Sequence, residues 1–239
     1  MIGRFHEVSV HAPDLLASLE FYERLGFTQV TAGEAFPYPY AAVADGRLAI
    51  GLHGRELAQS PLLAFVLPGL LGRLEWFERR SIAVLDRRLG SDVFNEASLE
   101  AGGQLLRLLE ARTHSPASLG PGETSRLGWF EEYALPVADP MRAAAEFEQL
   151  GFVPAEESDE PYPHIGLTSD SLNVALLAPG LLKRPAIVFS GPEMPARIAK
   201  LGEAGFEFAR RPPASLDASL HALLVAPEGT QLLLTTRAE

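Results

Sequence analysis

The chain has 239 residues, of which 47% are hydrophobic and 21% charged, so it can build a core and is not a disordered chain. Its formal net charge of -11 at pH 7 argues against nucleic acid or an anionic membrane as a partner. The absence of cysteine excludes disulfides, a thiolate nucleophile and a zinc–thiolate site.

No targeting or membrane-spanning segment is visible in the sequence. The first residues of the chain already include charged side chains and a histidine, and they lack the apolar stretch of a secretory signal. The most apolar segment, residues 61–71, is too short to cross a bilayer, which needs about 20 residues. We therefore expect a soluble cytoplasmic protein.

The first elements alternate between strand and helix patterns. Residues 5–11 alternate apolar and polar side chains, which predicts a half-buried strand. Asp14 is a good N-cap for a helix that Gly26 ends. Two strands, 41–44 and 47–53, follow and are joined by a hairpin turn at residues 45–46. The unit is therefore β-α-β-β-β.

The same unit returns later in the chain. Residues 130–152 repeat residues 5–27 with an offset of 125, including the helix-starting aspartate and a shared Leu-Gly-Phe end. A Pro-Tyr-Pro segment at 37–39 returns at 161–163. Weaker matches place further units at 61–110 and 185–236. A Ser-, Pro- and Gly-rich segment separates the halves. We therefore predict an α+β chain with one half at 1–113, a linker at 114–125 and a second half at 126–239.

The helix motif carries a family resemblance. Pro13-Asp14-Leu15, residues 18–22 and Leu25-Gly26-Phe27, between one strand and three more, resemble the glyoxalase, bleomycin-resistance and extradiol dioxygenase superfamily, also called vicinal oxygen chelate proteins. The resemblance implies four β-α-β-β-β modules paired into two curved sheets, each enclosing a cup. Metal-dependent members place a His, Gln or Glu on the first strand and a Glu on the last strand of their modules.

This sequence departs from that metal-binding pattern. The first-strand position holds Glu7 in the first half and Glu132 in the second. The last-strand positions hold Gly51 and Arg107 in the first half, and the second half has Ala175 and Leu233 there. One carboxylate in each cup does not hold a catalytic divalent ion. We therefore expect no metal and no other cofactor, with a displaced divalent-metal site formed by Glu7 and His53 as the alternative.

The remaining candidate site residues follow from the same positions. Arg107 replaces a metal-binding Glu, so we expect its guanidinium to pair with Glu7 in the first cup. Because Leu233 takes the place of Arg107 in the second half, Glu132 lacks such a partner and is the better candidate for a raised pKa or a ligand contact. Tyr40, and His164 at its place in the second half, are expected to line the cups. Glu7 and Glu132 are the candidate catalytic residues.

Three functions remain open at this point. The first is a metal-free protein of the bleomycin-resistance kind that binds a small apolar or aromatic molecule in one or both cups. The second is a lyase, isomerase or dioxygenase with a displaced metal site or a cup Glu as general base. The third is a scaffold with collapsed cups. The expected partner is a small molecule, with no nucleic acid and no membrane, and the protein is expected to be a monomer or a homodimer.

Overall fold

The computed structural model describes residues 2–30, 36–91, 94–111, 125–155, 159–169, 172–209 and 216–236. The predicted linker lies almost entirely outside these ranges. The secondary structure in the first half comprises β1 (Arg4–His11), α1 (Leu15–Arg24), β2 (Thr28–Val30), β3 (Tyr40–Ala44), β4 (Ala49–His53), β5 (Leu62–Leu67), α2 (Leu70–Glu78), β6 (Asp86–Arg88), β7 (Glu96–Ala101) and β8 (Gln104–Glu110). The second half contains β9 (Trp129–Pro136), α3 (Pro140–Gln149), β10 (Val153–Pro154), β11 (Ile165–Thr168), β12 (Asn173–Leu177), β13 (Ala186–Gly191), α4 (Met194–Glu203), β14 (Ala222–Val225) and β15 (Gln231–Thr236).

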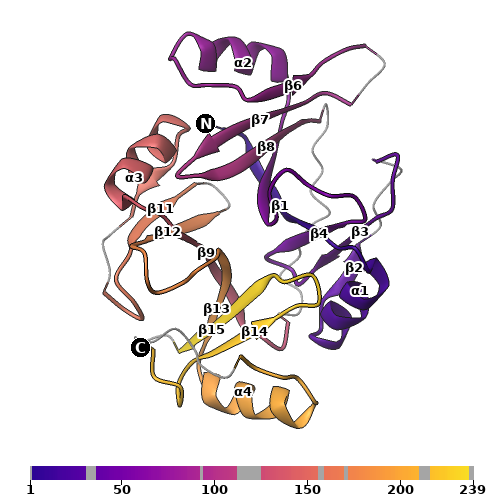
Figure 1. The fold of residues 1–239 in the computed structure, drawn as a ribbon, viewed down its shortest axis with the longest axis vertical. Coiled ribbons are helices and arrows are strands. Elements are labelled where there is room, and N and C mark those ends of the chain that lie inside the picture. Colours follow the sequence, from indigo (N-terminus) through magenta and orange to yellow (C-terminus); the bar gives the residue numbers. More distant parts are fainter. Residues whose placement is uncertain are drawn as a thin grey trace.

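The strands form two mixed sheets, one from each half of the chain (Figure 1). The strand order is β2-β3-β4-β1-β5-β8-β7-β6 in the first sheet and β10-β11-β12-β9-β13-β15-β14 in the second. In each sheet an antiparallel pair, β1 with β5 or β9 with β13, joins two modules at their first strands. The α+β fold of four modules in two sheets is thus confirmed.

The helix caps explain why the repeat motif folds as it does. The Asp14 carboxylate accepts a hydrogen bond of 3.0 Å from the backbone N–H of Ala17, and Asp139 accepts one of 3.0 Å from that of Arg142. Gly26 and Gly151 follow the two helices with φ values of 93° and 99°, a left-handed conformation that favours glycine. The capping residues therefore fix both helices at the predicted places.

The described residues of the fourth module contain two strands after the helix. Between α4 and β14 the described residues contain a single isolated β-bridge, from Phe208 to Leu224, in place of a full strand. This bridge lies on the side of β14 away from β15, where the first of three strands would pair. The prediction of three strands after each helix therefore holds for three modules in the described ranges.

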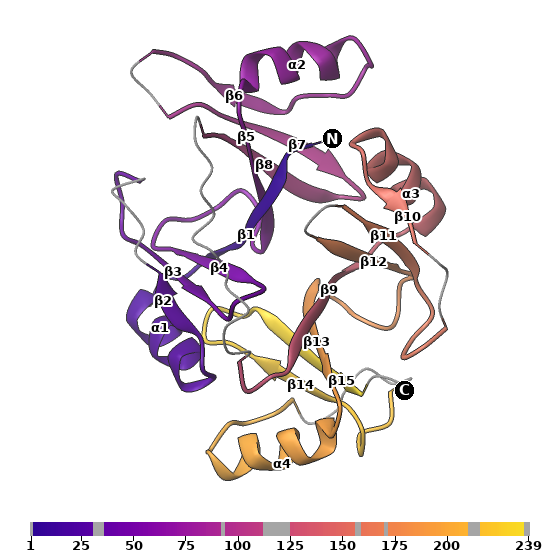
Figure 2. The ribbon, with the colours of Figure 1, turned by 180° about the vertical axis from the view of Figure 1, so that it is seen from behind.

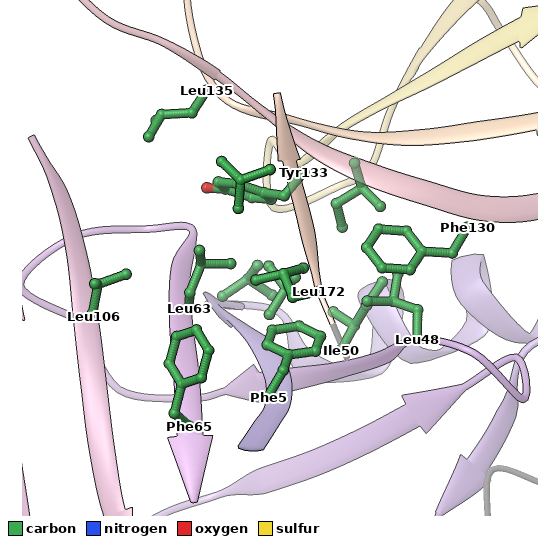
Figure 3. Packing of buried hydrophobic residues seen from close by; sticks show 14 of the residues in the cluster. Phe5, Leu48, Ile50, Leu63, Phe65, Leu106, Phe130, Tyr133, Leu135 and Leu172 are labelled. Carbon is green, nitrogen blue, oxygen red and sulfur yellow. The ribbon is translucent and has the colours of Figure 1, made fainter. Parts of the chain in front are cut away.

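One hydrophobic core holds the two halves together. Its buried side chains come from both sheets and from the helices. Figure 3 shows Phe5, Leu63 and Phe65 of the first sheet in the same cluster as Phe130 and Tyr133 of the second. On each sheet the opposite face carries the candidate site residues. We call these faces the first cup (Glu7, Gly51, Ala64, Arg107) and the second cup (Glu132, Ala175, Val188, Leu233).

Polar contacts also join modules of different halves. Helix α1 lies beside the β14–β15 hairpin, and α3 lies beside β7 and β8 (Figures 1 and 2). Ser18 and Tyr22 of α1 donate hydrogen bonds of 2.9 and 2.7 Å to the Glu228 carboxylate in that hairpin. Tyr133 donates one of 2.9 Å to the Gln104 side chain. The first module therefore contacts the fourth, and the second contacts the third. No helix in the described ranges is long and apolar enough to cross a membrane.

Candidate functional site

The sheet registers place the two candidate carboxylates at equivalent positions. Glu7 lies opposite Ala64, and Ala64 lies opposite Arg107. In the second sheet Glu132 lies opposite Val188, which lies opposite Leu233. Because residues in one row across a sheet point to the same face, each row belongs to its cup. Arg107 and Leu233 are therefore equivalent, as the repeat predicts.

Glu7 is buried and fully engaged by protein donors. Its side chain is 2% exposed, and its carboxylate lies where a Cβ on Gly51 would be, at 2.1 Å from such an atom. Ser9 donates a hydrogen bond of 2.6 Å to Oε1 and Tyr40 donates one of 2.5 Å to Oε2. His53 Nε2 lies 3.3 Å from Oε1. The first cup thus supplies hydrogen-bond partners for both oxygens of its carboxylate.

These contacts determine the proton positions on His53. Burial opposes ionisation of Glu7, but the hydrogen bond from His53 and the charges of His6 and His53 outweigh it and lower the pKa of Glu7. An ionised carboxylate only accepts, so Nε2 of His53 carries the hydrogen. When the imidazole is neutral, Nδ1 is an acceptor, and the Tyr38 hydroxyl 3.1 Å away can donate to it. Glu7, His53 and Tyr38 form one chain of hydrogen bonds.

The expected pairing of Glu7 with Arg107 is wrong. The guanidinium of Arg107 binds Glu96, with 2.9 Å between Nε and Oε2 and a second contact from Nη2 to the same oxygen. Glu96 lies diagonally across the β7–β8 ladder, since Ser98 is directly opposite Arg107. Glu96 on the neighbouring strand β7 lies on the same face as Arg107 and is closer to it than Glu7, which lies two strands away on β1. The alternation of residues 96–101 is the sequence signal that would have identified Glu96.

A β-bulge changes the side chains next to each carboxylate. The β1–β5 register shifts between Phe5 and Glu7, and the equivalent β9–β13 register shifts at the same point of the repeat. A regular strand would place His6 on the face opposite Glu7, whereas His6 Nε2 lies 3.9 Å from Glu7 Oε2. At this position the second half has Glu131. An imidazole neighbours the first carboxylate, and a second carboxylate neighbours the other.

Glu132 occupies a different environment from Glu7. Tyr162 donates a hydrogen bond of 2.7 Å to Oε1 of Glu132, and His164 Nε2 lies 3.8 Å from Oε2. Burial raises the pKa of Glu132, Tyr162 and His164 lower it, and the charge of Glu131 raises it further; the net shift is upward. Tyr162 matches Tyr38 in the repeated Pro-Tyr-Pro segment, the signal by which it could have been predicted.

When His164 is neutral, the second cup leaves two acceptors facing one another. His164 Nδ1 lies 2.9 Å from the backbone carbonyl of Tyr162, which can only accept, so Nδ1 carries the hydrogen. In the neutral imidazole Nε2 is then an acceptor, and it faces Glu132 Oε2. The tautomer of His164 is thus opposite to that of His53. A proton, or a donor group placed between the two atoms, would satisfy both.

The two cups also differ in how they are filled. Apolar residues line the second cup, among them the small side chains Ala134, Ala175 and Ala186 and the larger Val188, Leu177, Leu223 and Leu233. In the first cup His53 and Arg107 stand where Leu177 and Leu233 stand in the second. Beside Phe36, Tyr38 and Arg107 a hollow of about 10 Å³ is present at the cup mouth, roughly the space of one water molecule.

The residues present do not fit the divalent-metal site of metal-dependent relatives. Among the residues that the structure describes, no group of three His, Asp or Glu side chains could hold a metal ion. Glu7 and His53, the alternative pair, contact one another, and Ser9 and Tyr40 use the carboxylate oxygens. Because hydroxyl groups donate to both of its oxygens, the Glu7 carboxylate is held by protein side chains in place of a metal ion.

The two carboxylates are expected to give opposite pH dependences of stability. The folded pKa of Glu7 lies below 4.5, so its stabilising contribution is present above pH 4.5 and is lost as pH falls through the lowered pKa. The folded pKa of Glu132 lies above 4.5, so stability is lost as pH rises from 4.5 through the raised pKa. Urea unfolding of Glu7→Gln and Glu132→Gln at several pH values measures both.

Each variant removes one of these dependences. The stability advantage of wild type over Glu7→Gln should grow with pH below 4.5, and that over Glu132→Gln should shrink above it. Glu148→Gln, on the exposed side of α3, is the control and should follow wild type. Equal dependences in the two cup variants would contradict the assignment.

No protein-family model matches the sequence, and no curated protein matches it significantly. Solved structures do match. Homoprotocatechuate 2,3-dioxygenase from B. fuscum superposes with a TM-score of 0.65 at 17% identity, over 99% of this chain and 72% of that one. The 2,3-dioxygenase LapB from Pseudomonas sp. KL28 gives 0.65 at 13% identity, over 99% and 92%. A catechol 2,3-dioxygenase gives 0.61 at 14% identity, over 99% and 88%.

These neighbours are extradiol dioxygenases of the vicinal oxygen chelate superfamily. The resemblance inferred from the helix motif and the repeat is therefore confirmed as a resemblance of fold. At identities of 13 to 17% the likeness concerns the fold alone. The chemistry must be argued from the residues of the two cups.

Proposed function

We propose that this chain, which has the vicinal oxygen chelate fold, binds a small, largely apolar or aromatic molecule without a metal ion, and that the second cup is the binding site. The observation that carries the proposal is the pair of facing atoms, Glu132 Oε2 and His164 Nε2, 3.8 Å apart at the edge of a buried apolar cluster. A ligand hydroxyl or N–H group would donate to them.

A further acceptor supports the same ligand chemistry. Gln231 lies two residues before Leu233 on the same face of β15, and its side-chain Oε1 is buried with no hydrogen-bond partner in the described part of the chain. An unpaired buried acceptor costs free energy that a ligand donor would recover. The proposed ligand therefore combines an apolar body with at least one hydrogen-bond donor.

Phenol and toluene are suitable probes because they differ by the donor group. Isothermal titration calorimetry should show tighter binding of phenol to wild type. Glu132→Gln should reduce the preference for phenol by about tenfold, the magnitude of one hydrogen bond to a charged group. Leu233→Arg should abolish binding of both probes, since it introduces the side chain that occupies the first cup.

Glu7→Gln is the matched control because it makes the same change at the equivalent position of the filled first cup. It should lower stability and leave the affinity of both probes unchanged. Phenol binding that survives Leu233→Arg, or that disappears with Glu7→Gln, would contradict a site in the second cup. The comparison of variants thus separates binding from folding.

The alternative is a lyase, isomerase or dioxygenase that uses a displaced metal ion or a cup Glu as general base. Glu132 would be the base, because burial raises its pKa and a raised pKa makes the carboxylate a stronger proton acceptor. Metal analysis of the purified protein distinguishes the metal-free binding protein from a metal-dependent enzyme. We expect no stoichiometric Fe, Mn, Ni or Zn; a stoichiometric metal that Glu7→Gln or Glu132→Gln removes would establish the metal-dependent alternative.

A further inference from the structure

A second hollow lies outside both cups, between α4 and the segment that leads into β9. Its volume is about 380 Å³, and Arg126, Arg197, Lys200 and Glu193 line it together with the apolar Ala196 and Leu201. Three cations and one carboxylate therefore surround a single space. In a chain with a net charge of -11 such a local excess of positive charge is unusual.

One wall of the hollow is a face of a helix. Ala196, Arg197, Lys200 and Leu201 follow the spacing i, i+1, i+4 and i+5, which places them on one side of α4, and Glu193 is the N-cap residue directly before the helix. The helix thus presents two cations and a small apolar surface to the same space.

The other wall presents Arg126 from a fixed turn. The backbone N–H of Arg126 donates to the Leu25 carbonyl at 2.8 Å, and Ser125 Oγ donates to the Asp45 carboxylate at 3.1 Å. Gly128 has a φ of 103° and approaches the Ser190 carbonyl so closely that a Cβ would lie 2.5 Å from its oxygen. Contacts with both halves therefore hold the backbone that carries Arg126.

The three cations form no ion pair among the residues that the structure describes. Within the ranges described above, no carboxylate lies within 4.0 Å of the charged nitrogens of Arg126, Arg197 or Lys200, although other arginines form such pairs. Gathered cations repel one another unless an anion is bound between them. Guanidinium groups hold phosphate or carboxylate oxygens with two parallel hydrogen bonds.

The fold does not require this arrangement, as the first half demonstrates. Gly69 and Glu193 precede α2 and α4 with left-handed φ values of 65° and 58°, so the two helices start equivalently. Arg197 then corresponds to Arg73 and Lys200 to Trp76. Arg73 lies over the Trp76 ring, 5.5 Å from its centroid. In the described residues the first half thus has an aromatic ring under its arginine where the second half has a lysine.

We infer that the hollow lined by Arg126, Arg197 and Lys200 binds a small polyanion whose phosphate or carboxylate oxygens lie between the three cations. Ala196 and Leu201 leave room for a short apolar part of the same molecule. This site is separate from the second cup and does not depend on the ligand proposed for it.

Calorimetric titration at low ionic strength tests the site with inorganic phosphate and pyrophosphate as one arm and citrate as the other. We expect saturable binding, and the tighter arm identifies a phosphate or a polycarboxylate ligand. Arg126→Gln and Arg197→Gln should each weaken binding by about tenfold, and added salt should weaken it in wild type. The melting temperature without probe should not fall, because each change removes repulsion.

Arg73→Gln is the matched control: it removes the same charge at the equivalent helix position and should leave probe binding unchanged. Absence of binding by every probe at about 10 mM would overturn the inference. So would an equal loss in Arg73→Gln and Arg197→Gln, because it would show a general effect of charge. Phenol binding in the second cup should persist in all three variants.

Discussion

Replacing Gly51 by alanine is expected to destabilise the protein by about 3 kcal/mol, the scale of breaking a buried charged network. A Cβ there would lie 2.1 Å from Oε1 of Glu7 and 2.4 Å from Oε2, so the carboxylate must leave its position. It would then lose its hydrogen bonds from Ser9 and Tyr40 while remaining buried. Urea unfolding at pH 7 measures the loss.

A double-mutant cycle assigns that loss to Glu7. In a Glu7→Ala background the added methyl group meets no carboxylate, so Gly51→Ala should cost little, and the coupling free energy should be about 2 kcal/mol or more. The control is Ala175→Gly, the reverse change at the equivalent position of the second cup, which should cost less than about 1 kcal/mol. A Gly51→Ala penalty that persists in the Glu7→Ala background would refute this account.

Replacing Glu228 by alanine is expected to cost about 3 kcal/mol, because it removes the acceptor for both Ser18 and Tyr22 between the first and fourth modules. The Tyr22 side chain is fully buried, so its hydroxyl would lose its donor contact away from water. Chemical unfolding followed by circular dichroism measures the effect.

The relative stability losses of the single and double variants test whether Glu228 and Tyr22 interact. Tyr22→Phe should cost only about 1 kcal/mol, since the half-buried Glu228 can turn to water. The double variant Glu228→Ala/Tyr22→Phe should be more stable than Glu228→Ala alone, because the buried hydroxyl that lost its carboxylate acceptor is removed as well. Glu203→Ala, an exposed change on α4, should be nearly neutral. Additive penalties for Glu228 and Tyr22 would argue against the contact.

The local pattern of the sequence predicts much of the fold. Helix boundaries depend on residues close to the helix, here the N-caps Asp14 and Asp139 and the glycines Gly26 and Gly151. They can therefore be predicted without the rest of the chain. The repeat makes Glu7 equivalent to Glu132 and Arg107 equivalent to Leu233, because duplicated modules keep the register of their strands.

The partners of those residues depend on the tertiary structure. Arg107 binds Glu96 and leaves Glu7 to Tyr40 and His53, since the distances between side chains on a sheet depend on strand order and diagonal position. The bulges that bring His6 and Glu131 beside the two carboxylates interrupt the two-residue period on which sequence reasoning relies.

By itself, then, the sequence determined the modules, their duplication and the positions of the two carboxylates, because periodicity, caps and repeats are local. Only the tertiary structure decided that polar side chains occupy one cup and apolar ones the other, that His53 contacts Glu7 while His164 Nδ1 faces a backbone carbonyl, and that Arg126, Arg197 and Lys200 line one hollow. Each of these features depends on side chains from distant segments of the chain, and the packing of the modules determines which of those side chains come into contact.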